Sequence, residues 1–178
     1  MKYRLRKEYS TNPDNALKEI LTDRGVQDVQ HFMNPSKTCE NDPYYLENID
    51  KAADMLLYHL RRDSDILFIV DCDADGFTSS SILWLYIKHI FPKARLEFTV
   101  HEHKQHGLND KIEWITDEAK WDLVICPDAG SYDIKEHLAL GELGMDVICL
   151  DHHEQLYDDQ GNPVISNLPT TVVVNNQL

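Results

Sequence analysis

Acidic residues, joined at one place by two histidines, follow three short apolar runs of the sequence. The side chains at these three places are Asp71, Asp73 and Asp75, then Asp128, and finally Asp151, His152 and His153. Carboxylates crowded in one crevice repel one another, and drying each of them without a partner is costly. A divalent cation removes this repulsion, and carboxylate and imidazole ligands together suit Mn²⁺, Mg²⁺ or Fe²⁺ better than structural zinc. The pattern therefore predicts a site for divalent metal ions.

Two metal ions about 4 Å apart that share a carboxylate can activate water for in-line displacement at phosphorus. Because the ions also offset the charge of a phosphate ester, the pattern favours phosphate-ester hydrolysis. If the backbone stays extended after the first run, the three acids there project on the same side. Gly76 permits a sharp turn, after which Thr78, Ser79 and Ser80 are expected to cap a helix whose free N–H groups bind phosphate.

From residue 65 onward, short apolar runs alternate with helical patterns, which is typical of a parallel sheet covered on both faces. The expected strands are Ile66–Val70, Leu96–Val100, Leu123–Cys126, Asp146–Leu150 and Thr171–Val174, and the expected helices are Ser80–Phe91, Asp110–Lys120 and Ile134–Leu143. The predicted fold class is α/β, with a mostly parallel sheet and helices on both faces. Ligands of such sheets bind beyond the carboxyl ends of the strands, so the acids should meet at one edge.

A helical arm is expected to precede the sheet. Amphipathic patterns predict helices over residues 15–24 and 48–62, separated by loops at Asn34-Pro35-Ser36 and Asn41-Asp42-Pro43. The predicted domains are accordingly a helical arm over residues 1–62, packed against an α/β domain over residues 63–178.

The composition disfavours several classes of protein. The 178 residues include 31 acidic and 17 basic side chains, a net charge of −14, which argues against gripping nucleic acid by bulk charge. No apolar run approaches the length of a membrane span and the N-terminus lacks a signal-peptide core, so we expect a cytoplasmic protein without membrane contact. The four cysteines have no C-x-x-C spacing, which argues against a zinc knuckle. Cys72, Cys126 and Cys149 lie in or at the ends of apolar runs, so we expect these three to be buried thiols.

The residues at the strand ends resemble those of the DHH phosphoesterase superfamily, named for the motif that stands here as Asp151-His152-His153. Within it, the chain is similar to the RecJ-like single-strand-specific exonucleases, because residues 71–76 match their first motif and residues 127–130 stand where the second belongs. Short stretches before the sheet also resemble the RecJ N-terminal arm, namely Ile20-Leu21, Arg24-Gly25-Val26, residues 32–36, Asp42-Pro43 and Asp50-Lys51-Ala52.

The resemblance implies a metal ligand set. Asp73 and Asp75 would bind different metal ions, Asp128 would bridge the two ions, and His152 would bind the second one. The implied cofactor is a pair of Mn²⁺ ions, with Mg²⁺ as the alternative.

The resemblance also implies how the substrate is handled. His153 would contact the scissile phosphate, Asp151 would orient the histidines and Asp71 would be a supporting acid. The implied catalytic set is Asp75, Asp128 and His153.

A polar loop follows the second expected strand, where RecJ-like proteins place a basic, glycine-containing loop near the nucleic-acid phosphates. His103, Lys104 and His106 are the candidates for phosphate binding in this loop. The alternative is a solvated polar loop without a ligand.

The sequence departs from the family pattern in two respects. Ile69 stands where many DHH enzymes carry a metal-binding histidine, and the chain stops at Leu178, before a further ligand aspartate and a C-terminal domain. We therefore expect a fragment that keeps the fold and binds metal but has low activity.

The leading hypothesis is a metal-dependent phosphodiesterase that degrades single-stranded DNA from the 5′ end to mononucleotides, using water activated by two metal ions. The partners implied are single-stranded DNA and a replication or recombination protein. The alternatives are a DHH hydrolase of short oligonucleotides, cyclic dinucleotides or pyrophosphate, and a metal-binding or partner-docking module without turnover.

Overall fold

The computed structural model describes residues 8–102 and 106–178. Its contacts divide the chain into two compact units, residues 1–42 and residues 43–178. The first unit holds α1 (Pro13–Asp23), α2 (Val29–Met33) and the 3₁₀ helix η1 (Lys37–Cys39). Asn12 caps α1 by accepting a hydrogen bond from the N–H of Asp14 at 3.0 Å. None of the residues in these three helices is buried.

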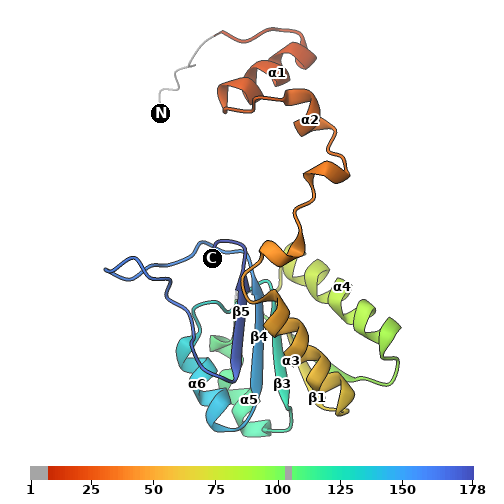
Figure 1. Cartoon of the computed structure of the whole chain (residues 1–178), viewed down its shortest axis with the longest axis vertical. Helices are drawn as coiled ribbons and strands as arrows, with labels where there is room; N and C mark the ends of the chain where they lie inside the picture. The colour runs from red at the N-terminus through yellow and green to blue at the C-terminus, as the bar shows by residue number, and fades with distance from the viewer. Residues whose placement is uncertain (1–7, 103–105) are drawn as a thin grey trace. The chain divides into compact units, whose positions relative to one another are not determined.

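A five-stranded parallel sheet forms the centre of the second unit (Figure 1). Its strands are β1 (Asp65–Val70), β2 (Arg95–Val100), β3 (Leu123–Pro127), β4 (Asp146–Asp151) and β5 (Thr171–Asn175). The strand order is β2-β1-β3-β4-β5. The predicted α/β class with a parallel sheet is confirmed, and each strand end lies within one residue of its expected place.

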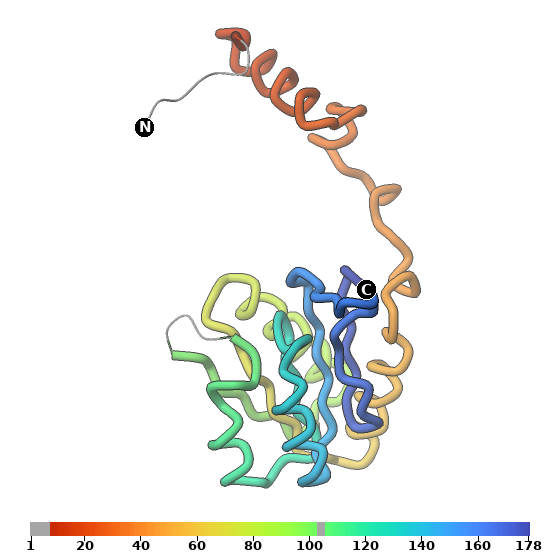
Figure 2. Tube along the Cα trace, turned by 90° about the vertical axis from the view of Figure 1, so that its left-hand side faces the viewer, coloured from red at the N-terminus to blue at the C-terminus, as the bar shows by residue number. Residues whose placement is uncertain are grey.

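Helices cover both faces of this sheet (Figures 1 and 2). They are η2 (Pro43–Tyr45), α3 (Ile49–Arg61), α4 (Ala74–Ile90), η3 (Asn109–Lys111), α5 (Ile112–Glu118) and α6 (Ile134–Glu142). The buried apolar side chains of α3 and α4 belong to one hydrophobic cluster, and those of α5 and α6 belong to a second cluster on the opposite face. No helix among the described residues is long and apolar enough to cross a bilayer.

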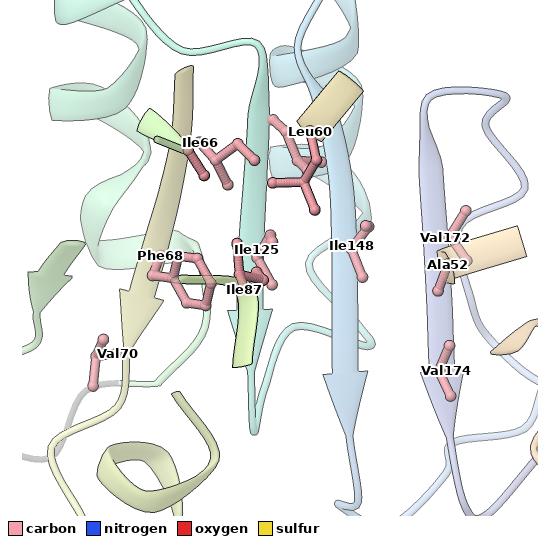
Figure 3. Packing of buried hydrophobic residues seen from close by; sticks show 12 residues of the cluster. Ala52, Leu60, Ile66, Phe68, Val70, Ile87, Ile125, Ile148, Val172 and Val174 are labelled. Carbon is pink, nitrogen blue, oxygen red and sulfur yellow. The ribbon is translucent and has the colours of Figure 1, made fainter. Parts of the chain in front are cut away.

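The strands are apolar without interruption because successive side chains enter opposite clusters. Phe68, Ile125 and Ile148 point towards α3 and α4, where Figure 3 shows them packed in one layer. Their chain neighbours Leu67 and Val124 belong to the cluster under α5 and α6. This double burial holds the sheet rigidly, so the strand ends occupy fixed positions relative to one another.

Helix α3 belongs to the sheet unit, whereas the sequence analysis placed it in the arm. Its Ala52 and Leu60 are buried in the cluster that covers β1, β3, β4 and β5. Asn48, which precedes α3, also donates from Nδ2 to the backbone oxygen of Val173 in β5 at 3.0 Å. The division in the structure therefore falls after residue 42 rather than after residue 62, because this amphipathic helix buries its apolar side on the sheet.

Helix α4 begins at Ala74, six residues before the expected start at Ser80. Asp73 caps it, because the Asp73 carboxylate accepts a hydrogen bond from the N–H of Gly76 at 2.9 Å. Gly76 lies against the end of β1, where an added Cβ would stand 2.6 Å from the Cβ of Asp71. The expectation of an extended stretch after β1 is therefore wrong: the helix begins three residues after Asp71.

The sheet has a topological switch point between β1 and β3. The chain crosses from β1 outward to β2, whereas β4 and β5 are added on the other side, beyond β3. Loops that leave neighbouring strands in opposite directions open a crevice at their carboxyl ends, where α/β proteins bind ligands. Asp71 and Asp128 directly follow β1 and β3 at this crevice.

Candidate metal and phosphate site

The three acids after β1 occupy different environments. Asp71 is buried, Asp73 is the exposed N-cap of α4, and Asp75 is exposed in the first helical turn. The hydrogen bond from the N–H of Gly76 is the main cause that lowers the pKa of Asp73, so this carboxyl is ionised at neutral pH. The turn into α4 thus leaves Asp71 inside the protein and places Asp73 and Asp75 at the surface.

Asp128 reaches the site from the end of β3, in a left-handed backbone conformation with φ of 97°. Its N–H donates to the backbone oxygen of Leu150 at 2.6 Å, which ties this turn to β4. Burial is the main cause that raises the pKa of Asp128, and the nearby charge of Asp73 raises it further. The Nε2 atom of His152 lies 3.0 Å from Oδ1 of Asp128. Two of the expected metal ligands are therefore in direct contact.

Asp151 fixes the position of His153. One oxygen of Asp151 accepts hydrogen bonds from the His153 ring Nδ1 at 2.8 Å and from the His153 N–H at 3.0 Å, and the other accepts from the Ser131 N–H at 3.0 Å. Burial acts to raise the pKa of Asp151, but these hydrogen bonds outweigh it and lower the pKa to about 2. The same contact raises the pKa of His153 above its ordinary value. Asp151 is therefore an anion that orients the imidazole.

The loop after β2 brings His106 to the same place. Nδ1 of His106 lies 2.7 Å from Oδ2 of Asp71, and the ring centroids of His106 and His153 are 6.1 Å apart. His101, at the start of this loop, is buried with its Nε2 atom 2.8 Å from the backbone oxygen of Gly107. The other two candidates from the sequence, His103 and Lys104, lie outside the described residues.

A cavity of about 310 Å³ opens between these segments. Its lining consists of His106, Gly107, Ala129, Gly130, Ser131, Tyr132, Asp133, Asp151 and His153. Of the expected site residues, His106, Asp151 and His153 line the cavity, whereas the four expected metal ligands do not. The cavity is therefore a space beside the expected metal ligands, large enough for part of a ligand and walled by two imidazoles.

The expected metal ligands do not form a complete coordination site. Among the residues that the structure describes, no group of three or more His, Cys, Asp or Glu side chains is placed to hold a metal ion. Asp128 and His152 are in contact, and the charge of Asp73 acts on the pKa of Asp128. Asp75 is exposed on α4. The donor set is nevertheless one of carboxylate oxygens and an imidazole, as Mn²⁺ and Mg²⁺ accept.

Ser79 and Ser80 are not at the N-terminus of α4, where the sequence analysis placed them. The hydroxyl of Ser79 is directed to the backbone oxygens of Gly76 at 3.2 Å and Pro127 at 3.4 Å. Ser80 is buried, and its hydroxyl finds no hydrogen-bond partner. Because α4 starts earlier, the free N–H groups of its first turn belong to the residues after Asp73 instead.

Two residues of the site escaped the sequence analysis. Asp133 accepts a hydrogen bond from the N–H of Leu108 at 2.6 Å and thereby joins the β2 loop to the turn after β3. Asn175 donates from Nδ2 to the Ser131 hydroxyl at 3.0 Å and to the backbone oxygen of His153 at 3.1 Å. Asn175 ends an apolar strand just as the acids do, which is a signal that the sequence contains. Asp133 precedes a helix and resembles an ordinary N-cap, so no sequence signal distinguishes it.

Comparisons with known proteins show which proteins this chain resembles. The chain is 44% identical over 154 residues to the SPbeta prophage protein YorK of Bacillus subtilis (strain 168), whose name assigns it single-strand DNA-specific exonuclease activity. This alignment covers 86% of the chain but only 26% of YorK. The single-stranded-DNA-specific exonuclease RecJ of the same organism is 27% identical over 140 residues, which are 76% of this chain and 18% of RecJ.

A crystal structure of exonuclease RecJ bound to manganese superposes with a TM-score of 0.59 and 26% identity, over 75% of this chain and 32% of that chain. The chain thus spans about a quarter of the length of the first of these relatives. The sequence model of the DHH family, N-terminal domain, matches residues 65–174. This match covers the whole sheet and more than half of the sequence, and the chain therefore belongs to the DHH family.

Proposed function

We propose that this chain is the metal-binding part of a nuclease that hydrolyses single-stranded DNA from its 5′ end to mononucleotides. The observation that carries the proposal is the meeting of two Asp–His pairs, Asp128–His152 and Asp151–His153, at the carboxyl ends of β3 and β4. Support for this substrate comes from YorK and RecJ, whose names specify single-stranded DNA.

The residues present fit a divalent metal. Asp128, with His152 at 3.0 Å, would be the central ligand, because a carboxylate and an imidazole this close together can bind the same cation. Asp73 and Asp75 would supply further carboxylates from the first turn of α4. Two Mn²⁺ ions, or Mg²⁺ in their place, would stabilise the developing charge on the phosphate and lower the pKa of water. The manganese in a related RecJ crystal structure supports this choice.

The side chains of this chain would do the remaining work. Asp151 holds His153 by Nδ1, so the Nε2–H of a protonated His153 is free to donate to a phosphate oxygen of the substrate. The raised pKa of His153 favours the protonated, phosphate-binding form. In the overall reaction, water adds to the phosphorus between the first two nucleotides and the bond from this phosphorus to the 3′ oxygen of the terminal nucleotide breaks. The terminal nucleotide leaves with a 3′ hydroxyl group, and the remaining strand keeps a 5′ phosphate.

The biological setting of this activity is part of the same proposal. A nuclease of this type would act in the cytoplasm beside a replication or recombination protein. With a net charge of −14, the chain is poorly suited to hold a long DNA strand by charge alone, so we expect slow, poorly processive digestion.

Two measurements on the full chain test the proposal. Calorimetric titration should show Mn²⁺ binding, and 5′-labelled single-stranded DNA should release mononucleotides only in the presence of Mn²⁺. Asp128→Ala should abolish both, while Asp159→Ala in an exposed turn should change neither. The proposal fails if Mn²⁺ does not bind, or if the chain hydrolyses pyrophosphate and leaves DNA intact.

A further inference from the structure

Two Asp–His pairs, Asp151–His153 and Asp71–His106, each place an imidazole in the lining of the cavity, and only Asp151–His153 belongs to the DHH motif. Nδ1 of His153 lies 2.8 Å from Asp151, and Nδ1 of His106 lies 2.7 Å from Asp71. The carboxylates are 2% and 1% exposed, whereas the imidazoles are 48% and 50% exposed. The two pairs are therefore alike in distance, in the ring atom used and in burial.

The buried carboxylate of Asp71 determines how the His106 ring is presented. A carboxylate at Nδ1 keeps the proton on that atom and leaves Nε2, on the far side of the ring, to meet a ligand. Asp71 itself is held in place, since its other oxygen lies 3.3 Å from the N–H of Gly107 and 3.6 Å from Nε2 of His101. The orientation of the His106 ring is thus set from inside the protein.

The backbone after His106 is also fixed. The Leu108 N–H donates to Asp133 at 2.6 Å, and the Gly107 oxygen lies 2.8 Å from Nε2 of His101. Gly107 has φ of 70°, and a side chain there would collide with the Asp133 carboxylate. These contacts join the β2 loop to both neighbouring strand ends. His106 is held in the lining of the cavity, where its ring centroid lies 6.1 Å from that of His153.

We propose that His106 is a second phosphate-contacting residue of the site, acting opposite His153, and that Asp71 is the residue that positions it. Two half-exposed imidazoles lining one cavity offer N–H donors to a single anion, and charge-assisted N–H···O bonds of roughly 2.8 Å fit such a bridge. The inference rests on the proposed function, because it takes the anion to be the phosphate group of a nucleotide. It adds to the DHH motif a contact from a loop outside that motif.

Histidine NMR of the metal-free full chain tests this placement without relying on catalysis. With ¹⁵N-labelled histidine, the phosphate complex should show protons on both ring nitrogens of His106, with Nδ1–H at Asp71 and Nε2–H at the anion. Titration with inorganic phosphate or a deoxynucleoside monophosphate should move the His106 and His153 signals together, with one dissociation constant. A shift of His153 alone, or no shift of either, would overturn the proposal.

Substitutions separate contact from positioning. His106→Ala should weaken phosphate binding about tenfold, the effect of losing one charge-assisted hydrogen bond. His106→Gln should recover part of the loss, because its amide nitrogen stands near the position of Nε2. His89→Gln, at an exposed histidine near the end of α4, is the matched control and should bind as the wild type does. Equal binding by His106→Ala and the wild type would contradict the inference.

The role of Asp71 is tested by Asp71→Asn, which should change the tautomer signal of His106 and weaken phosphate binding while His153 keeps its own signal. Because Asp71 is buried, the exposed His106 variants keep the proposal testable if this variant does not fold. In Mn²⁺-dependent hydrolysis, His106→Ala should raise KM more than it lowers kcat. A wild-type chain that binds phosphate through both histidines but does not hydrolyse DNA would refute the proposed function and leave this inference standing.

Discussion

Cys126 and Cys149 are direct partners on the neighbouring strands β3 and β4, and both are buried in the cluster under α5 and α6. Asp128 and Asp151 each follow one of these cysteines by two residues. The register of the two strands therefore delivers both acids to the same level of the sheet edge. A slip of one residue would send the acid to the opposite face, so the buried strand pairing determines the geometry of the site.

Asp128→Ala should lower Mn²⁺ occupancy more than Asp71→Ala does. Asp128 contacts the ligand candidate His152, whereas Asp71 contacts His106 and His101 instead. Calorimetric titration of each variant measures the occupancy, with thermal unfolding to show that the variants are folded. Equal losses in the two variants would contradict the bridging role of Asp128.

Two substitutions of Asp73 should separate helix capping from metal binding. Asp73→Asn keeps a cap oxygen for the N–H of Gly76, so it should retain stability but lose metal affinity. Asp73→Ala should lose metal affinity and should also lower the free energy of unfolding, because the N–H of Gly76 loses its cap. Urea unfolding without metal and Mn²⁺ titration measure the two effects. If Asp73→Asn binds Mn²⁺ as the wild type does, Asp73 is a cap only.

The metal-free protein should lose stability in acid as the carboxylate of Asp151 becomes protonated. The pKa of Asp151 falls from 3.8 to about 2 on folding, so its ionised form stabilises the fold above about pH 4. This contribution, about 2 kcal/mol, is lost as pH falls through 2, where both states are protonated. Asp151→Asn should flatten the pH dependence of urea unfolding between pH 4.5 and pH 2.5 in the presence of a chelator. Asp159→Asn is the surface control, and an unchanged slope in Asp151→Asn would refute the assignment.

Gly107→Ala should destabilise the protein more than Gly161→Ala. Both glycines have positive φ, 70° and 81°, but a Cβ at Gly161 meets nothing within 4 Å, whereas one at Gly107 collides with Asp133. Gly161→Ala should therefore cost about 1 kcal/mol of backbone strain, and Gly107→Ala should cost more. Urea unfolding compares the two. Gly107→Ala should also shift the NMR signal of His106. Equal losses of unfolding free energy in the two variants would show that the loop around Gly107 adjusts to the added Cβ.

The fold was predictable because its signals are strong and repeated. Apolar runs such as Leu123–Cys126 are buried on both faces, and only a covered parallel sheet accounts for several of them in alternation with helices. The placement of acids at strand ends followed from the same pattern. The start of α4 was missed because the run of serines and Thr78 resembles a cap, while the residue that caps the helix, Asp73, was assigned to metal binding alone.

The contacts within the site could be anticipated only in part. The adjacency of Asp151 and His153 is local in sequence, so their interaction was foreseeable. The partnership of Asp71 with His106 joins residues 35 positions apart through a loop whose path no periodicity indicates. The same holds for the hydrogen bond between Leu108 and Asp133.

The polar residues of the site lie at or beyond the last residues of the strands, while the apolar residues that stabilise the sheet lie within the strands. The residues that form the core of the sheet and the residues that form the site are thus different parts of the same sequence. A mutant library confined to the turns at 128–133 and 151–154 would explore new ester substrates on an unaltered scaffold. In a family with this arrangement, the reaction can change through substitutions in the turns while the fold stays the same.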